Sequence, residues 1–203
     1  AVGMRREENQ DSFGVVKREL FHGYFVADGM GGAQGGATAS RMAIALLSEA
    51  LHSPDIQPHR EIVPLLQNIN RRIFEKGSSE PAFAGMGTTL VGLLFTPDSV
   101  LCVNIGDSRA YRIRGTSVIQ ISEDHTLVKE LVKAGTIAPE DAQEHPISHM
   151  LTRSLGPVAD VKVECKLLPD LPHSGDFYVL CSDGLYNYVT PEEIASVVNQ
   201  NPI

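Results

Sequence analysis

The alternation of apolar and polar positions near the start of the chain predicts a β-hairpin. β-branched and aromatic residues fill residues 12–17 and again residues 20–27, on either side of a short polar break, which is typical of paired strands. After Gly36 the apolar residues instead recur at helical spacing, over residues 37–51 and over residues 61–74. This part of the chain therefore predicts two strands followed by two amphipathic helices.

Short apolar runs separated by turn residues predict further strands in the rest of the chain. The expected strands are residues 88–95, 100–105, 110–113, 161–168 and 176–181. Strands in runs and helices in pairs, without strict alternation of the two, are typical of an α+β fold built on antiparallel sheet. Neither an internal repeat nor a flexible linker interrupts the 203 residues. The length and this continuity predict one domain.

Two later helices are predicted from their capping residues. Asp124 is a candidate N-cap for a helix over about residues 126–134. Thr190 and Glu193 form a capping box, which predicts the start of a last helix that continues through Val198.

Composition and charge exclude several classes of protein. Hydrophobic residues make up 42% and charged residues 21% of the chain, as in an ordinary globular protein. No run approaches the roughly 20 apolar residues of a membrane span, so we expect no membrane association. The formal net charge of −8 argues against a nucleic-acid partner, because phosphate backbones are bound by clustered Lys and Arg. An acidic chain can still act on phosphate esters if a metal ion supplies the positive charge.

The three cysteines indicate a reducing environment. They have no CxxC spacing, and Cys102 and Cys181 lie inside apolar runs. This favours buried free thiols over disulfides or zinc ligands. A cytoplasmic location is therefore expected.

Three aspartates stand beside a glycine where apolar runs end. The runs are YFVADG, VLCVNIGD and FYVLCSDG, which contain Asp28, Asp107 and Asp183. One such Asp-Gly pair usually marks only a turn, but three carboxylates at one rim of a sheet would repel each other unless a cation lay between them. Oxygen ligands without His or Cys favour Mg²⁺ or Mn²⁺ over Zn²⁺. Asp11, just before the first strand, is a candidate fourth carboxylate.

The glycine-rich segment GMGGAQGG, residues 29–36, has a rival interpretation as a dinucleotide-binding loop, because it follows a strand and precedes a helix. Gln34 replaces the third glycine of GxGxxG, and Glu49, the acidic residue about twenty positions on, falls inside a predicted helix. Both differences disfavour that interpretation. The chain also lacks a P-loop and the DxD of an aspartyl-phosphate phosphatase.

A binding or regulatory module, in which the acidic cluster holds only a structural ion, is a third class that composition leaves open. Arg6 weighs against it, because a guanidinium five residues before Asp11 could clamp a phosphate beside the metals. Taken alone, however, an arginine such as Arg6 is more typical of a solvated surface position.

The motifs of the chain resemble, in the same order, those of bacterial members of the PP2C (PPM) family of metal-dependent serine/threonine protein phosphatases. The similar segments are residues 6–12 (REENQDS), 26–32 (VADGMGG), 85–89 (GMGTT), 104–109 (NIGDSR), 124–126 (DHT), 151–156 (LTRSLG) and 181–185 (CSDGL). The resemblance covers nearly the whole chain. It implies an α-β-β-α sandwich of two antiparallel sheets flanked by helices.

The resemblance also implies a centre of two Mn²⁺ or Mg²⁺ ions at one end of the sandwich. By position, Asp11, Asp28, the backbone carbonyl of Gly29 and Asp183 are similar to its ligands. Asp107 with Asp183 resembles a third, weaker metal site. The implied mechanism is in-line attack on phosphorus by a hydroxide that bridges the two metals.

Further expectations come from the same resemblance. Arg6 matches the phosphate-binding arginine, so it joins Asp11 and Asp28 as a candidate catalytic residue. The implied partners are phosphorylated protein substrates and a cognate serine/threonine kinase pathway, and we expect a monomer. His125, His145 and a third histidine, His149, lie in or near a variable flap, and we expect them to be structural or exposed to solvent.

The chain departs from the family pattern at three places. Gln10 replaces a frequent Glu, and Met30 replaces the His of eukaryotic relatives. The family closes with a late Asp-Asn motif on a final strand, whose Asp is a metal ligand, and the chain ends at Ile203 before such a motif. Residues 1–203 are therefore expected to form one phosphatase domain that is incomplete at its C-terminus and lacks its last strand. The alternative is a catalytically weak or inactive module that binds phosphoproteins.

Overall fold

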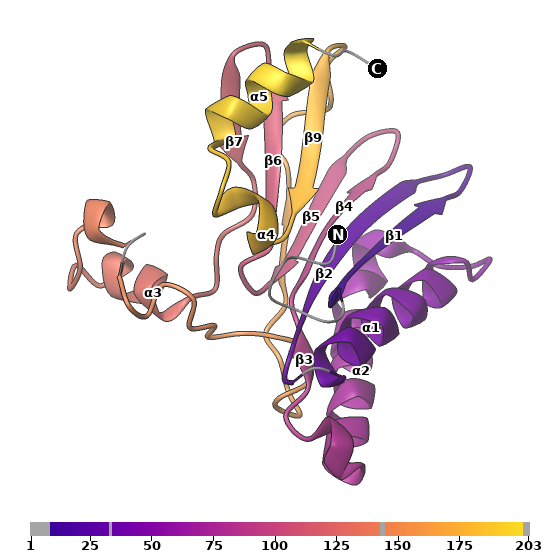
Figure 1. Ribbon diagram of the computed structural model, residues 1–203. Coiled ribbons are helices and arrows are strands. Elements are labelled where there is room, and N and C mark those ends of the chain that lie inside the picture. The colour runs from indigo at the N-terminus through magenta and orange to yellow at the C-terminus, as the bar shows by residue number, and fades with distance from the viewer. Residues whose placement is uncertain (1–8, 33, 143–144, 201–203) are drawn as a thin grey trace.

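A computed structural model of the protein describes residues 9–32, 34–142 and 145–200, which form four layers (Figure 1). Two helices, α1 (Gly35–Leu51) and α2 (Pro58–Ser79), cover one face of a large antiparallel sheet. A smaller antiparallel sheet packs against the other face, and helix α5 (Pro191–Gln200) lies across this second sheet. The α-β-β-α sandwich expected from the motif order is confirmed.

The two sheets are antiparallel throughout. The larger contains β1 (Asp11–Lys17), β2 (His22–Met30), β4 (Leu90–Phe95), β5 (Val100–Ile105) and β8 (Glu164–Leu167) in this order, with β3 (Gly87–Thr88) paired to β2. The smaller has the order β7 (Ser117–Gln120), β6 (Arg109–Arg114), β9 (Asp176–Cys181). The remaining helical segments are α3 (Leu127–Lys133), α4 (Asp183–Tyr186) and the 3₁₀ turns η1 (Pro81–Phe83) and η2 (Pro139–Asp141).

Three apolar clusters hold the layers together. The largest lies between α1, α2 and the larger sheet, and includes Leu47, Leu66 and Leu94, none of which is exposed to solvent. The second lies between the two sheets, and the third lies under α5, where Ile194 and Ile113 are buried. Cys102 and Cys181 are buried free thiols, as predicted. In the part of the chain that the structure describes, no helix is both long and apolar enough to span a membrane.

The structure corrects two of the expected elements. Helix α2 extends beyond residues 61–74 at both ends. Apart from Pro58, the added residues at the two ends are polar or glycine, so they carry no apolar periodicity that would have predicted them. The N-cap of α3 is Thr126, whose hydroxyl accepts a hydrogen bond from the Lys129 N–H, so the prediction of Asp124 as the cap is wrong. Asp124 pairs instead with Arg109.

The capping box at the start of α5 is confirmed. The backbone N–H of Thr190 donates to Glu193 Oε2 at 2.8 Å, and the N–H of Glu193 donates to Thr190 Oγ1 at 3.2 Å. The two bonds satisfy N–H groups that have no partner within the helix.

The start of α1 lies directly against the end of β2, because two glycines meet there. A Cβ on Gly29 would lie 2.1 Å from the carbonyl oxygen of Gly36, and a Cβ on Gly36 would lie 2.8 Å from the Gly29 carbonyl carbon. Only residues without a side chain fit at such a distance. Gly29 and Gly36 therefore allow close helix-to-strand packing beside Asp28.

We expect Gly29→Ala to lower the free energy of unfolding by about 3 kcal/mol, at the upper end of overpacking costs, because backbone on both sides resists displacement. Urea denaturation measures this decrease in the free energy of unfolding. Gly184→Ala is the matched control, since its Cβ would have only Ser182 Oγ nearby, at an ordinary 3.7 Å. Equal stability of the two variants would show that α1 can move away from β2 without cost.

Candidate metal centre and phosphatase site

The register of the β1–β2 hairpin places two of the predicted aspartates opposite each other. Asp11, the first residue of β1, is the cross-strand partner of Asp28 near the end of β2. Directly opposed residues of an antiparallel pair share one face of the sheet, with Cβ atoms about 4.5–5.5 Å apart. The hairpin alone therefore brings two carboxylates together.

The backbone of Asp28 is held from the other side by the two threonines of the GMGTT segment. The Asp28 N–H donates to Thr89 Oγ1 at 3.0 Å, and the Asp28 carbonyl accepts from Thr88 Oγ1 at 3.0 Å and from the Thr89 N–H at 2.9 Å. The hydroxyls of Thr89 and Ser108 are 2.6 Å apart. Asp28 is thus anchored to β3 and β4, and through Ser108 to the turn that carries Asp107.

Asp107 and Asp183 reach the same region from the ends of β5 and β9. Gly106, with φ of +104°, makes the turn that carries Asp107, a backbone conformation that favours glycine. Asp183 opens α4 directly after β9. The Ser182 hydroxyl donates to Asp11 Oδ2 at 3.2 Å, joining segments 171 positions apart in the chain.

The surroundings of Asp28 and Asp107 raise the pKa of both carboxyl groups. For Asp28 the causes, largest first, are burial, the negative charges of Asp11 and Asp183, a hydrogen bond with Asp11 and the charge of Asp107, and together they raise its pKa to about 8. Burial also raises the pKa of Asp107 to about 6, helped by the Asp124 charge and opposed by a hydrogen bond from Tyr186. A hydrogen bond between two carboxyl groups requires a proton, which the raised pKa of Asp28 allows this group to keep near neutral pH.

The donor set of this rim suits a hard divalent cation. Its side chains offer oxygen atoms only, which favours Mg²⁺ or Mn²⁺, and the carboxylate repulsion is relieved when a cation replaces the Asp28 proton. Within residues 9–32, 34–142 and 145–200, no three His, Cys, Asp or Glu side chains converge closely enough to form a complete ligand set. The backbone of Gly29 adjoins the rim, where its N–H donates to the Gln10 carbonyl at 3.1 Å. Arg6 lies outside the described residues.

Comparison with known proteins identifies the family. Residues 4–200 match the protein phosphatase 2C family. The chain belongs to this family.

Relatives of the same family are similar over nearly the whole chain. The serine/threonine phosphatase stp of Listeria welshimeri is 37% identical over 202 residues, which cover 97% of this chain and 79% of the relative. Protein phosphatase PhpP of Streptococcus pneumoniae is 36% identical, covering 98% of this chain and 82% of the relative. The solved S. agalactiae serine/threonine phosphatase superposes with a TM-score of 0.91 at 32% identity, covering 100% of this chain and 85% of the other.

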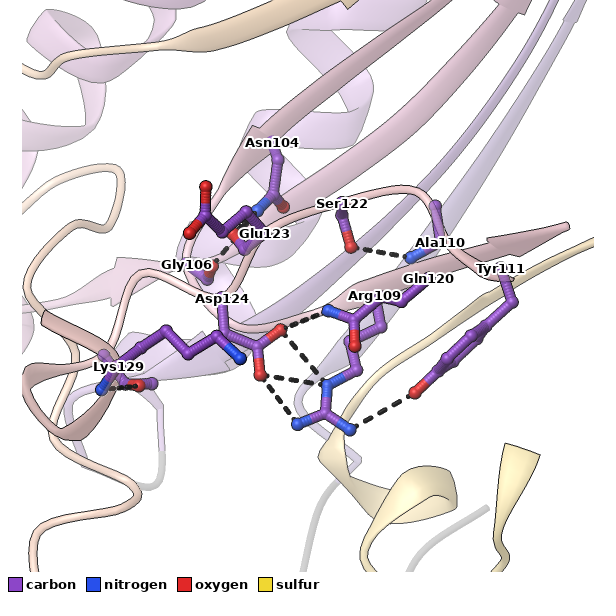
Figure 2. A network of polar contacts seen from close by, with 11 residues as sticks. Asn104, Gly106, Arg109, Ala110, Tyr111, Gln120, Ser122, Glu123, Asp124 and Lys129 are labelled. Carbon is purple, nitrogen blue, oxygen red and sulfur yellow. Dashed lines mark hydrogen bonds and ion pairs between the residues drawn. The ribbon is translucent and has the colours of Figure 1, made fainter. Parts of the chain in front are cut away.

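An ion-pair network behind the metal rim connects two of the PP2C motifs (Figure 2). Arg109 Nε lies 3.1 Å from both carboxylate oxygens of Asp124, and a terminal nitrogen of Arg109 donates to Asp124 Oδ2 at 2.7 Å. Gln120 Nε2 donates to Asp124 Oδ1 at 2.7 Å. Charged groups in such a two-point contact hold each other in a defined orientation.

Tyr186, which the sequence patterns did not single out, packs against this network. The Arg109 guanidinium lies over the Tyr186 ring, 3.7 Å from its centroid, and the Tyr186 side chain opposes the rise in the pKa of Asp107. The only signal in the sequence is the spacing from Asp183, since residues three apart in a helix lie on the same face.

The three histidines near the flap have different surroundings. His125 is buried, with Nδ1 accepting from the Gly106 N–H at 3.1 Å and Nε2 lying 3.1 Å from Glu164 Oε2. Burial lowers its pKa, and these contacts agree with the structural role expected of it. His145 is half-buried, and His149 is exposed to solvent.

We expect Asp28→Asn to raise the melting temperature in EDTA at about pH 8 and to change it little near pH 4. Native Asp28, with its pKa raised to about 8, binds a proton that the unfolded chain has already lost above about 4. Its stabilising contribution is therefore complete below about pH 4 and is lost as the pH rises through about 8. Asparagine carries no charge at either pH.

Differential scanning calorimetry of the variant and the parent at both pH values measures this effect. An increase of at least about 2–4 °C at the higher pH corresponds to roughly 1 kcal/mol in a domain of this size. Asp160→Asn, at a side chain that is 92% exposed, is the matched control and should leave the difference near zero. An equal change in melting temperature at both pH values would show that the effect does not come from the charge of Asp28.

Proposed function

We propose that this protein is a metal-dependent serine/threonine protein phosphatase that hydrolyses phosphoserine and phosphothreonine in proteins. The observation that carries the proposal is the gathering of Asp11, Asp28, Asp107 and Asp183 at one rim of a PP2C fold, where burial and the neighbouring carboxylates together raise the pKa of Asp28 to about 8. Its serine/threonine phosphatase relatives are 36–37% identical over nearly the whole chain.

We assign the tightly bound divalent cations to Asp11, Asp28, the Gly29 carbonyl and Asp183, and a third, weaker cation to Asp107 with Asp183. Bound cations supply a nucleophile by lowering the pKa of water, and they neutralise charge on the phosphoryl oxygens. This positive charge is essential here, because a chain with a formal net charge of −8 would otherwise repel a phosphate dianion.

The chain's own residues supply rigidity and orientation. The backbone of Asp28 makes three hydrogen bonds with Thr88 and Thr89, donating one and accepting two, and one oxygen of Asp11 accepts a hydrogen bond from Ser182. Fixed ligands keep their orientation as charge develops on the substrate, which is the condition for electrostatic stabilisation of a transition state. Arg6 is assigned to binding the substrate phosphate, as its position in the opening motif suggests.

Turnover of a phosphothreonine peptide is expected to need Mn²⁺ or Mg²⁺ and to stop in excess EDTA. Asp183→Asn should lower kcat/KM at least about 100-fold, because even residues that only support metal ligands cost 10–100-fold when changed. Asp160→Asn is the matched control and should retain full activity. Phosphate release measured over a range of Mn²⁺ concentrations tests both the metal dependence and the effect of Asp183→Asn.

The same experiment separates the enzyme from a phosphoprotein-binding module. A module would bind the phosphopeptide without releasing phosphate at any Mn²⁺ concentration. Activity that survives complete chelation would instead contradict the metal-dependent mechanism.

We expect Arg6→Ala to raise KM for the phosphopeptide with a smaller effect on kcat, because a guanidinium that binds phosphate contacts substrate and transition state alike. Arg6→Lys should recover part of the affinity, since lysine keeps the charge but not the two-point geometry. Steady-state kinetics at saturating Mn²⁺ measures both constants. An unchanged KM in both variants would place Arg6 outside the substrate site.

A further inference from the structure

The turn that carries Asp107 is held at both backbone groups of Gly106 by one residue, His125. The Gly106 N–H donates to His125 Nδ1 at 3.1 Å, and the Gly106 carbonyl accepts from the His125 N–H at 3.0 Å. The N–H belongs to the planar peptide unit before the Gly106 Cα, and the carbonyl belongs to the unit after it. The two bonds together therefore fix both dihedral angles of Gly106, and with them the direction in which the chain enters Asp107.

Gly106 is the residue least able to hold this turn by itself. A Cβ at this position would lie 2.6 Å from Thr89 Cγ2, so only glycine fits. Glycine, however, adopts positive and negative φ about equally readily, and the φ of +104° found here is one choice among several. Asn104 Nδ2 adds only a longer bond of 3.3 Å to the Gly106 carbonyl (Figure 2). The conformation of the turn therefore depends on its contacts with His125.

The imidazole of His125 is kept in the form that accepts the Gly106 N–H. Burial lowers the pKa of His125, and the charge of Arg153 adds to this effect, against the opposing effect of Glu164. A neutral imidazole has one donor and one acceptor nitrogen. Because Nδ1 accepts from Gly106, Nε2 carries the proton, and the Glu164 Oε2 atom lies 3.1 Å from it. Glu164, on strand β8, therefore selects the tautomer.

The backbone of His125 is fixed independently of the turn. Its carbonyl accepts from the Thr152 N–H at 2.9 Å, and the next residue, Thr126, forms an isolated β-bridge with Leu151. The side chain is only 5% exposed. His125 is thus a rigid support, held by residues 151–152 and by β8, against which the Gly106 turn is set.

We propose that His125 is a positioning residue that fixes the Gly106 turn and thereby holds the Asp107 carboxylate in place for the weaker cation. Glu164 supports it by keeping the ring nitrogen that faces Gly106 an acceptor. The proposal rests on the proposed phosphatase function and on the assignment of Asp107 to that cation. In this role His125 acts only through the Gly106 backbone.

Two substitutions at His125 separate the two ends of its ring. Asparagine places an acceptor oxygen close to the position of Nδ1, whereas glutamine places its amide close to the position of Nε2 and leaves the Gly106 N–H without an acceptor. Binding of Mn²⁺ to the metal-free protein is followed by the EPR signal of the free ion. We expect His125→Gln to weaken the weaker binding phase about 10-fold, at the lower end of the range for residues that support metal ligands.

The matched variants should behave differently in the same measurement. His125→Asn should keep most of the affinity of the weaker phase, and the tighter phase should stay unchanged in both variants. His149→Gln, at an exposed histidine, should leave both phases intact. A histidine that only filled the core would lower the melting temperature in EDTA without changing the weaker phase. Equal affinities of the Asn and Gln variants would therefore overturn the proposal.

Hydrogen exchange of the Gly106 amide, followed by NMR in the metal-free protein, tests the step between His125 and the metal. Exchange should be faster in His125→Gln and close to that of the parent in His125→Asn. Glu164→Ala leaves the imidazole in place and removes the group that selects its tautomer, so it provides the test if the His125 variants do not fold. Unchanged Gly106 exchange and an unchanged weaker phase in Glu164→Ala would then overturn the proposal.

Asp107→Asn separates this proposal from those on which it rests. His125→Gln should have no further effect on Mn²⁺ binding in the Asp107→Asn background, and additive losses would overturn the role of His125. An intact weaker phase in Asp107→Asn alone would overturn the metal assignment instead. Phosphate release by the parent protein is measured alongside, and its absence at every Mn²⁺ concentration would overturn the phosphatase function whatever the binding curves show.

Discussion

The repulsion among carboxylates at one rim of the sandwich is the constraint on which the rest of this structure depends. Asp11 and Asp28 are opposed by strand register, and neither can move away without breaking the hairpin ladder. Burial and this repulsion together raise the pKa of Asp28 to about 8, well above that of an ordinary surface aspartate. Such a site stores unfavourable energy that a divalent cation can release.

Hydrogen bonds to the backbone hold these carboxylates together against their mutual repulsion. The backbone of Asp28 is bound on both sides, by Gln10 through the neighbouring Gly29 N–H and by the hydroxyl and amide groups of Thr88 and Thr89. The Thr89 hydroxyl in turn meets Ser108 at 2.6 Å. Motifs that lie far apart in the sequence therefore act as one hydrogen-bonded frame, whose function is to prevent the carboxylates from separating.

The strands, the long helices and the candidate site residues Asp28, Asp107 and Asp183 could be predicted because each has a local signal, whereas Asp11 was suggested only by its position before the first strand. Apolar runs of period two or 3.6 identify the buried faces, and an acidic residue beside glycine marks the strand end. The four-layer arrangement came from the order of motifs and not from periodicity. Helix α4, which spans only Asp183–Tyr186, and strand β7, which is mostly exposed, carry too few buried apolar residues to be recognised.

Asp124 shows why side-chain partners are harder to predict than elements. Its position before a helix satisfies the local rule for an N-cap, yet Thr126 takes that role and Asp124 pairs with Arg109, 15 positions earlier. The half-buried guanidinium of Arg109 needs a counter-charge, because an unpaired charge away from water is costly, whereas the helix already has Thr126 as its cap. The competing partner comes from another strand, so only the folded chain reveals it. Tyr186 was missed for the same reason, since its partner Arg109 lies on a segment that the sequence places almost 80 positions away.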